Sequence, residues 1–161
     1  MSQERFQERW QSPSPFGPCA CSQLRRTARR VSSLYDEALE TCGLTVTQYA
    51  ILVSVGRAEQ VSRTALAERL GTDRTTLTRN LRPLEKAKLV VTTASLDRRE
   101  RLLCLSAEGR RKLRQSYQLW EKAQQRFMKE LGADALEQLR SALQAAEAAA
   151  KTVMSEARQQ A

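Results

Sequence analysis

Basic and hydroxyl side chains recur along the segment GTDRTTLTRNLRPLEKAKLV, residues 71–90. If residues 74–88 form a helix, the step of about 100° per residue places Leu77, Leu81 and Leu84 in one narrow sector. The groups left for the opposite side and its flanks suit DNA contact: Arg74, Thr75, Thr76, Thr78, Arg79, Arg82 and Lys86. Arginine can grip guanine O6 and N7 in the major groove, and threonine can contact a thymine methyl group or a phosphate. The segment therefore predicts a helix that reads a DNA groove.

Two residues of this segment need a structural explanation. Asp73 would repel the DNA backbone unless its carboxylate caps the helix N-terminus. Pro83 lacks an N–H and presses on the carbonyl of Arg79, which costs about 3 kcal/mol in a helix interior. We expect the proline to bend the helix, or to split it into a groove-reading first half and a core-packing second half. The alternative is a kink without functional meaning.

A second cationic group follows in LVVTTASLDRRERLLCL, residues 89–105. Valine, threonine and leucine flank a charged centre, which is typical of a β-hairpin with a charged tip. The tip carries Asp97, Arg98 and Arg99. An arginine on a projecting ribbon suits the minor groove, where negative potential is concentrated, and Asp97 could hold it by a charge-assisted hydrogen bond. The alternative is a solvated charged turn.

The cysteines are the remaining candidates for chemistry. Cys19 and Cys21 open an expected helix, where the helix N-terminus and the nearby Arg25 and Arg26 would favour a thiolate. The four cysteines have no histidine beside them and no paired C-x-x-C spacing, so the sequence predicts no metal site, and it predicts no cofactor.

Charge and composition narrow the class of protein. The chain has 161 residues and a net charge of +9, from 27 basic and 18 acidic residues. This excess favours polyanions, nucleic acid first and an anionic membrane second, although solubility alone is an alternative. The absence of histidine removes the usual general base near neutral pH. No apolar run approaches the roughly 20 residues of a membrane span, and the polar N-terminus is no secretory signal. We therefore expect a cytoplasmic protein that binds DNA and no membrane.

Helical elements must position these groups. Three prolines in SPSPFGP predict a flexible N-terminal arm over residues 1–18. An apolar stripe predicts a helix over 19–42, which Gly43 ends. Thr45 or Thr47 can cap the next helix, which ends near residue 56. Two short helices separated by a glycine-containing turn then form a helix-turn-helix, in which Ser62 can cap the first helix and Thr72 and Asp73 can cap the second.

The C-terminal part predicts two long helices. Ser106 can cap a helix through about residue 131, Gly132 breaks it, and a last helix covers 134–157. The apolar stripes on 24–42 and 136–153 cannot all be buried in so small a domain. Paired across a two-fold axis, they would form a helical dimer core that holds two reading helices about 34 Å apart over a palindromic site. An intramolecular helical bundle is the alternative.

The order and spacing of these motifs resemble one known family. GLTVTQYAIL, LAERLGTDRTTLTRNLRPLEKAKLV and DRRERLLCLSAEG occur here as in the MarR family of winged-helix transcription regulators, over roughly residues 19–157. The resemblance implies a mainly α fold with a small β-hairpin. It implies a winged helix-turn-helix domain over 45–105 and a helical dimerisation region over 19–44 and 106–161. It also implies a homodimer, with a helix in each major groove, wings on the minor groove, and repression relieved by a small ligand or an oxidant.

The resemblance suggests two kinds of signal. In proteins that this chain resembles, the ligand is typically an aromatic acid, and Arg25, Arg29 and Tyr49 could line its pocket. The peroxide-sensing branch has a reactive cysteine where Cys21 stands and a tyrosine where Tyr35 stands. It usually has further tyrosines where this chain has Val46 and Arg25. Cys21 is otherwise a small residue at the dimer edge.

Two other classes of protein compete with a DNA-binding regulator. An enzyme with Cys21 as nucleophile would lack a histidine partner and a glycine-rich phosphate loop, so we expect no enzyme. A helical adaptor could use the same basic face to bind an acidic protein or RNA.

Overall fold

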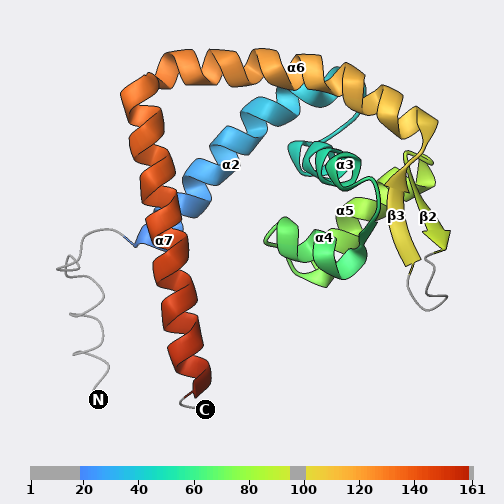
Figure 1. Ribbon diagram of the computed structural model, residues 1–161. Coiled ribbons are helices and arrows are strands. Elements are labelled where there is room, and N and C mark those ends of the chain that lie inside the picture. Colours follow the sequence, from blue (N-terminus) through green and yellow to red (C-terminus); the bar gives the residue numbers. More distant parts are fainter. Residues whose placement is uncertain (1–18, 95–100, 160–161) are drawn as a thin grey trace, which may run out of the picture. The chain divides into compact units, whose positions relative to one another are not determined.

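The structure, a computed structural model, describes residues 19–94 and 101–159. The chain forms two compact units, Met1–Ser116 and Tyr117–Ala161, each of which is considered by itself. The first contains α2 (Ala20–Leu39), a 3-10 turn η1 (Glu40–Cys42), α3 (Val46–Ala58), β1 (Val61–Ser62), α4 (Arg63–Arg69), α5 (Arg74–Lys86), β2 (Val90–Ala94) and β3 (Arg101–Leu105) (Figure 1). Helix α6 (Ala107–Leu131) begins in the first unit and ends in the second, and α7 (Ala133–Gln159) completes the chain. The fold is mainly helical with a small sheet, as predicted; the predicted arm 1–18 lies outside the described residues.

Local hydrogen bonds set the start of helix α3. Gly43 adopts a φ of 63°, which favours glycine, and lets the chain reverse after α2 and η1. Thr45 then forms a capping box with Gln48: the Gln48 N–H donates to Thr45 Oγ1 and the Thr45 N–H donates to Gln48 Oε1. Asp36 of α2 accepts from the Val46 N–H at 2.6 Å, which ties the two helices together.

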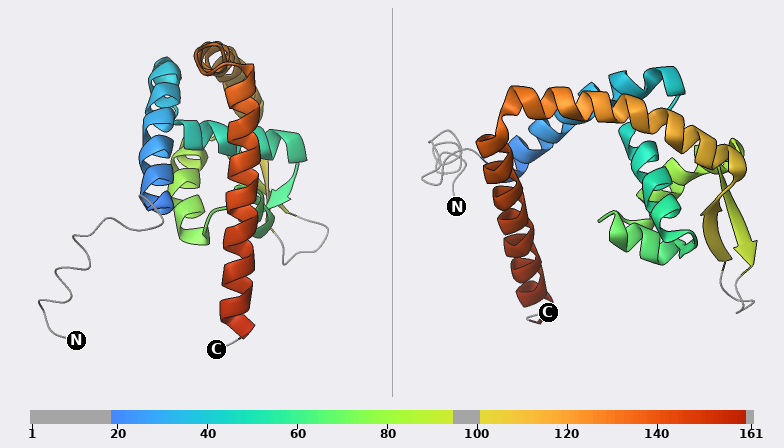
Figure 2. Two further views of the ribbon diagram at one scale, coloured as in Figure 1. Left: turned by 90° about the vertical axis from the view of Figure 1, so that its left-hand side faces the viewer. Right: turned by 45° about the horizontal axis from the view of Figure 1, so that its top comes forward.

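The helix-turn-helix is formed by α4 and α5, which lie beside each other next to α3 in both Figures 1 and 2. Ser62 caps α4 by accepting from the Ala65 N–H, as predicted. Gly71 turns the chain with a φ of 60°. Leu66 of α4 is fully buried, and it belongs to the same core as the three leucines of α5. This core holds the two helices in their crossing.

Pro83 does not split α5, which is one continuous helix from Arg74 to Lys86. The expectation of two separate halves is therefore wrong. Both Pro83 and Arg79 are exposed, so the Arg79 carbonyl that loses its intrahelical donor lies on the solvent side. Leu81 and Leu84 on either side of the proline are buried and hold the helix together.

The hairpin is part of a three-stranded antiparallel sheet with the order β1-β3-β2. Its two main strands form the predicted hairpin, and their pairing runs from Val90 with Leu105 to Ala94 with Arg101. The short strand β1 pairs Val61 with Leu103 and was not predicted. Two residues are too few for an alternating pattern to be visible, and only the tertiary pairing defines this strand.

Helices α6 and α7 follow the predicted boundaries closely. The Gly109 N–H donates to Ser106 Oγ, which confirms the predicted cap of α6, and Gly132 with a φ of 83° separates it from α7. In α7, all of which is described, no residue is buried within its own unit. Among the described residues no single helix is long and apolar enough to span a membrane. Only the pair Ala20–Cys42 and Val46–Ala58, taken together, has the length and composition of a span, and this pair is bent.

Candidate nucleic-acid interface

Burial of one side of α5 determines which side chains face outward. Leu77, Leu81 and Leu84 are all buried to 2% exposure or less. The side chains of Arg74, Arg79, Arg82 and Lys86 are exposed, as predicted from the helical spacing. A shallow hollow of about 460 Å³ on this surface is lined by five predicted DNA-contact residues: Arg74, Thr75, Thr78, Arg79 and Arg82. The structure thus brings five of the seven predicted helix residues around one hollow.

The acidic residue at the start of α5 caps the helix. Asp73 Oδ1 accepts from the Thr76 N–H at 2.8 Å, and Asp73 Oδ2 accepts from the Thr76 hydroxyl at 2.7 Å. These bonds favour the carboxylate form, and the side-chain bond from Thr76 is the main reason why the pKa of Asp73 lies below its ordinary value. The cap predicted from the sequence is confirmed.

The second acidic residue of α5 is also paired. Glu85 accepts from Arg63 Nη2 at 2.6 Å, in a half-buried ion pair that joins the C-terminal part of α5 to the start of α4. Both acids of the segment are therefore occupied by contacts within the helix-turn-helix. The outward face of α5 keeps four cations with no acid opposing them on the helix itself, which attracts a polyanion.

The three threonines of α5 present different groups. The Thr78 hydroxyl donates to the Arg74 carbonyl at 2.7 Å, which leaves its methyl group and lone pairs for contact. Thr76 is half-buried and its hydroxyl is bound to Asp73. Thr75 is exposed, and its hydroxyl makes no hydrogen bond within the described residues. Thr75 and Thr78 are thus better placed than Thr76 to contact a ligand.

The hairpin closes at the pair Ala94 and Arg101. The predicted tip residues Asp97, Arg98 and Arg99 lie between these two positions in the chain and outside the described residues. Arg101 is exposed at the start of β3.

The two residues proposed for redox chemistry lie on one helix. Cys21 is exposed in the first turn of α2, whereas Tyr35 is buried, and burial raises the pKa of its hydroxyl. They are 14 residues apart, so a rise of about 1.5 Å per residue separates them by about 21 Å along the helix. Within one chain the structure does not bring them together.

The residues proposed to line a ligand pocket differ in accessibility. Arg25 and Arg29 are exposed and four residues apart on α2, so they share one side of the helix. Tyr49 of α3 is buried in the hydrophobic core of the first unit. Of the three, only the arginines are accessible to a ligand without opening the core.

Sequence reasoning missed two contacts that position α5. One is the Arg63–Glu85 ion pair, whose partners are 22 residues apart. The other is a polar joint around Ser106 and Gly109, where the start of α6 meets the residues that follow α5. Helical spacing reveals neither contact, because both depend on how separate elements pack.

Comparisons with known proteins agree with this geometry. Residues 43–100 match the family model described as MarR family. The M. tuberculosis transcriptional regulator MosR, solved in complex with DNA, is 36% identical, with a TM-score of 0.70 over 82% of this chain and 98% of that one. The transcriptional repressor CouR, bound to a 23-mer DNA duplex, is 27% identical, with a TM-score of 0.73 over 80% and 92%. A mutant MarR from E. coli complexed with operator DNA is 25% identical, with a TM-score of 0.71 over 78% and 91%. The search of curated proteins finds no match.

The cap of α5 makes the stability of this helix depend on pH. A folded-state pKa below the ordinary value of about 3.9 means that ionised Asp73 stabilises the fold above that pH, and that this contribution is lost as pH falls through the lowered pKa. We expect Asp73→Asn to lower Tm at pH 5 to 7 and to converge on the parent as the pH falls through the lowered pKa of Asp73. Thermal unfolding across this range measures the effect. Glu68→Gln removes an exposed acid that caps no helix and should follow the parent throughout. A gap between Asp73→Asn and the parent that stays constant into acid would contradict the assignment.

Proposed function

The chain belongs to the MarR family of winged-helix DNA-binding transcriptional regulators, and from this premise we propose that it is a homodimeric repressor of a palindromic operator, released by a small organic ligand. Family membership makes it a regulator and not an enzyme. DNA as the partner further supports a cytoplasmic location.

The observation that carries the proposal is the outward cationic face of α5. The major groove is about 12 Å wide and admits one α-helix, whose exposed side chains then reach the base edges. Arg79 and Arg82 lie in the middle of the exposed side and can donate paired hydrogen bonds to guanine. Lys86 and the tip arginines Arg98 and Arg99 are suited to phosphate and minor-groove contacts.

The second unit supports a dimer. Leu143 is 47% exposed and Val153 is 64% exposed on a helix of 27 residues that buries nothing in its own unit. Most helices in proteins are stabilised by packing an apolar face, so a surface of this kind requires a cover. A second copy of the chain supplies the same apolar stripe across a two-fold axis. Two reading helices about 34 Å apart would then require a palindromic site.

The exposed arginines of α2 support an acidic ligand. Arg25 and Arg29 project from the same side of the helix, where two guanidinium groups could hold one carboxylate by charge-assisted hydrogen bonds. A small aromatic acid held there would release DNA if it bound the free form of the dimer more tightly than the DNA-bound form.

A second candidate signal is an oxidant, such as an organic peroxide, acting on Cys21. Its exposure on the first turn of α2 makes the thiol accessible. Since Tyr35 lies about 21 Å away on the same helix, any contact between the two must come from the other copy in a dimer. The oxidant hypothesis therefore also requires the homodimer.

Removal of a reading arginine tests DNA recognition. We expect Arg79→Ala to reduce the preference for the selected operator over random DNA by about 10- to 100-fold, because each paired guanine contact contributes about 1–3 kcal/mol of discrimination. Arg99→Ala should instead weaken binding to most sequences and reduce its dependence on salt. Duplexes selected from a random pool, titrated at several salt concentrations, provide the measurement.

Arg114→Ala is the matched control, because it removes the same charge from an exposed site on α6. If Arg79→Ala and Arg99→Ala both bound operator and random DNA as the parent does, the DNA-reading face would be wrongly assigned. Preferential binding to RNA or an acidic protein, with no palindrome selected, would instead support the adaptor.

A charge on the apolar stripe tests the dimer. Leu143→Glu should shift the molar mass in solution from dimer to monomer and lower affinity for the full palindrome by about 100-fold or more, since two linked contacts become independent ones. Light scattering after size exclusion gives the mass. Gln144→Glu, at the exposed neighbouring position, should remain dimeric. A stable dimer of Leu143→Glu would contradict this interface.

Substitution of Cys21, one of the two exposed cysteines, separates the two signals. If an oxidant is the signal, Cys21→Ser should stay on operator DNA at organic peroxide concentrations that release the parent, whereas Cys104→Ser should still be released. Fluorescence anisotropy of labelled operator follows the release. Unchanged release of Cys21→Ser by peroxide would exclude the sensor role and leave the acidic ligand as the favoured signal.

A further inference from the structure

The end of α5, the proposed recognition helix, has an unusual backbone conformation. The chain leaves α5 through two nested hydrogen bonds, from the Lys88 N–H to the Glu85 carbonyl and from the Leu89 N–H to the Leu84 carbonyl. This closing pattern requires a left-handed residue at position 88, where glycine is the usual choice. Here the residue is Lys88, with a φ of 56°. A lysine persists in this conformation only where its surroundings hold it.

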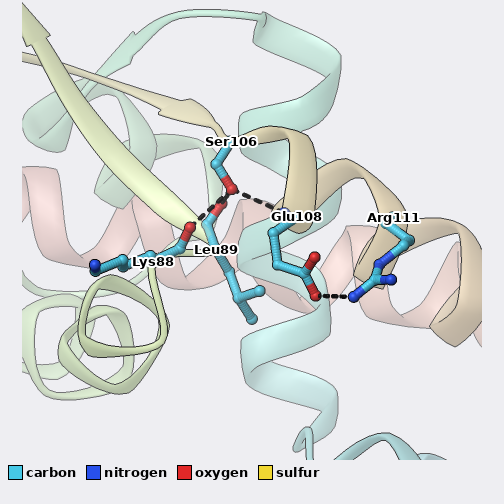
Figure 3. A network of polar contacts seen from close by, with 6 residues as sticks. Lys88, Leu89, Ser106, Glu108 and Arg111 are labelled. Atoms are coloured by element: carbon cyan, nitrogen blue, oxygen red, sulfur yellow. Dashed lines mark hydrogen bonds and ion pairs between the residues drawn. The ribbon is translucent and has the colours of Figure 1, made fainter.

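The start of α6 supplies that support. The Ser106 hydroxyl donates to the Lys88 carbonyl at 2.7 Å, and the Ser106 N–H donates to the Leu89 carbonyl at 3.1 Å (Figure 3). The same hydroxyl oxygen accepts from the Gly109 N–H at 2.9 Å and so caps α6. One serine thus binds the residues that follow α5 and begins α6. The nearby Glu108–Arg111 ion pair is exposed and lies within α6 alone.

Gly109 lies closer to the backbone of Leu89 than a residue with a side chain could. A Cβ added at this position would lie 2.0 Å from the Leu89 carbonyl oxygen and 2.9 Å from its carbon. The clashing atoms are backbone, so they cannot move aside as the end of a flexible side chain could. Leu89 and Val90 are themselves buried, which prevents this backbone from shifting toward the core without cost.

We propose that Ser106 and Gly109 are positioning residues for DNA reading, which lock the end of α5 against the start of α6 and thereby set the separation of the two recognition helices in a dimer. The proposal rests on the proposed function. Helix α6 continues from this joint to Leu131 as one element and carries the chain into the second unit. A small rotation at the joint therefore changes where a recognition helix meets its half-site, without altering any side chain that touches DNA.

The selectivity for half-site spacing tests the proposal. The probes are the palindrome selected from a random pool, the same duplex with one or two base pairs inserted or removed between its halves, and an isolated half-site. The parent should prefer the selected spacing by about 10-fold or more, because half-site spacing follows from protein geometry. Gly109→Ala should lose about 10-fold at the selected spacing, and its preference should flatten or move to another spacing, while half-site affinity changes by less than about 3-fold.

Two further variants keep the test decisive if Gly109→Ala does not fold. Ser106→Ala removes the bond to the Lys88 carbonyl and should weaken the preference for the selected spacing, as Gly109→Ala does. Ser106→Thr keeps a hydroxyl at this position and should retain the spacing preference of the parent. Gly56→Ala is the matched control, because its added Cβ meets only the side-chain ends of Leu105 and Leu113 at 3.0 and 3.1 Å. It should keep the spacing preference of the parent.

The outcomes distinguish three situations. A flattened or shifted spacing preference in the Gly109 or Ser106 variants supports the joint. A uniform loss of affinity at every spacing, with a lower Tm and the parental preference intact, would mean that these residues only stabilise the fold and would overturn the proposal. Failure of the parent to select any palindrome would overturn the proposed function itself, and the joint's role in spacing with it.

Discussion

The burial of three leucines on one side of α5 is the constraint on which the rest of the structure depends. Leu77, Leu81 and Leu84 are almost completely removed from solvent, and burial of a leucine side chain is worth about 1.5–3 kcal/mol. A helix held by three such contacts cannot rotate about its axis without exposing them. The arginines of the opposite side are therefore presented outward in one fixed orientation, and the proline within the helix is tolerated because the leucines around it stay packed.

The charge of this face depends on where the acids are placed. Asp73 and Glu85 would each reduce the attraction of α5 for a polyanion if they faced outward without partners. Asp73 instead caps the helix, and Glu85 pairs with Arg63 of α4. The cap of α5 and the ion pair between the two helices thus leave the outward face with uncompensated cations, so the stability of the motif and its electrostatic function have a common origin.

The two units differ in how far each buries its own apolar residues. The first unit encloses a core of buried leucines and valines, together with a sheet that contributes Leu103 and Leu105. The second unit has a long helix with an apolar stripe and no buried residue. This surface is the basis of the proposed pairing with a second copy of the chain, and the joint at Ser106 and Gly109 lies at the start of α6, the helix that begins in the first unit and ends in the second.

The sequence by itself determined the helices, their caps and the outward side of α5, because these follow from local spacing and from side chains that bond within three residues, as Ser62, Asp73 and Ser106 do. It also indicated the hairpin through its β-branched flanks. Only the tertiary structure decided the continuity of α5 through Pro83, the strand at Val61, the burial of Tyr49 and the joint between Gly109 and Leu89. Each of these depends on atoms from segments distant in the chain, whose packing no local pattern encodes.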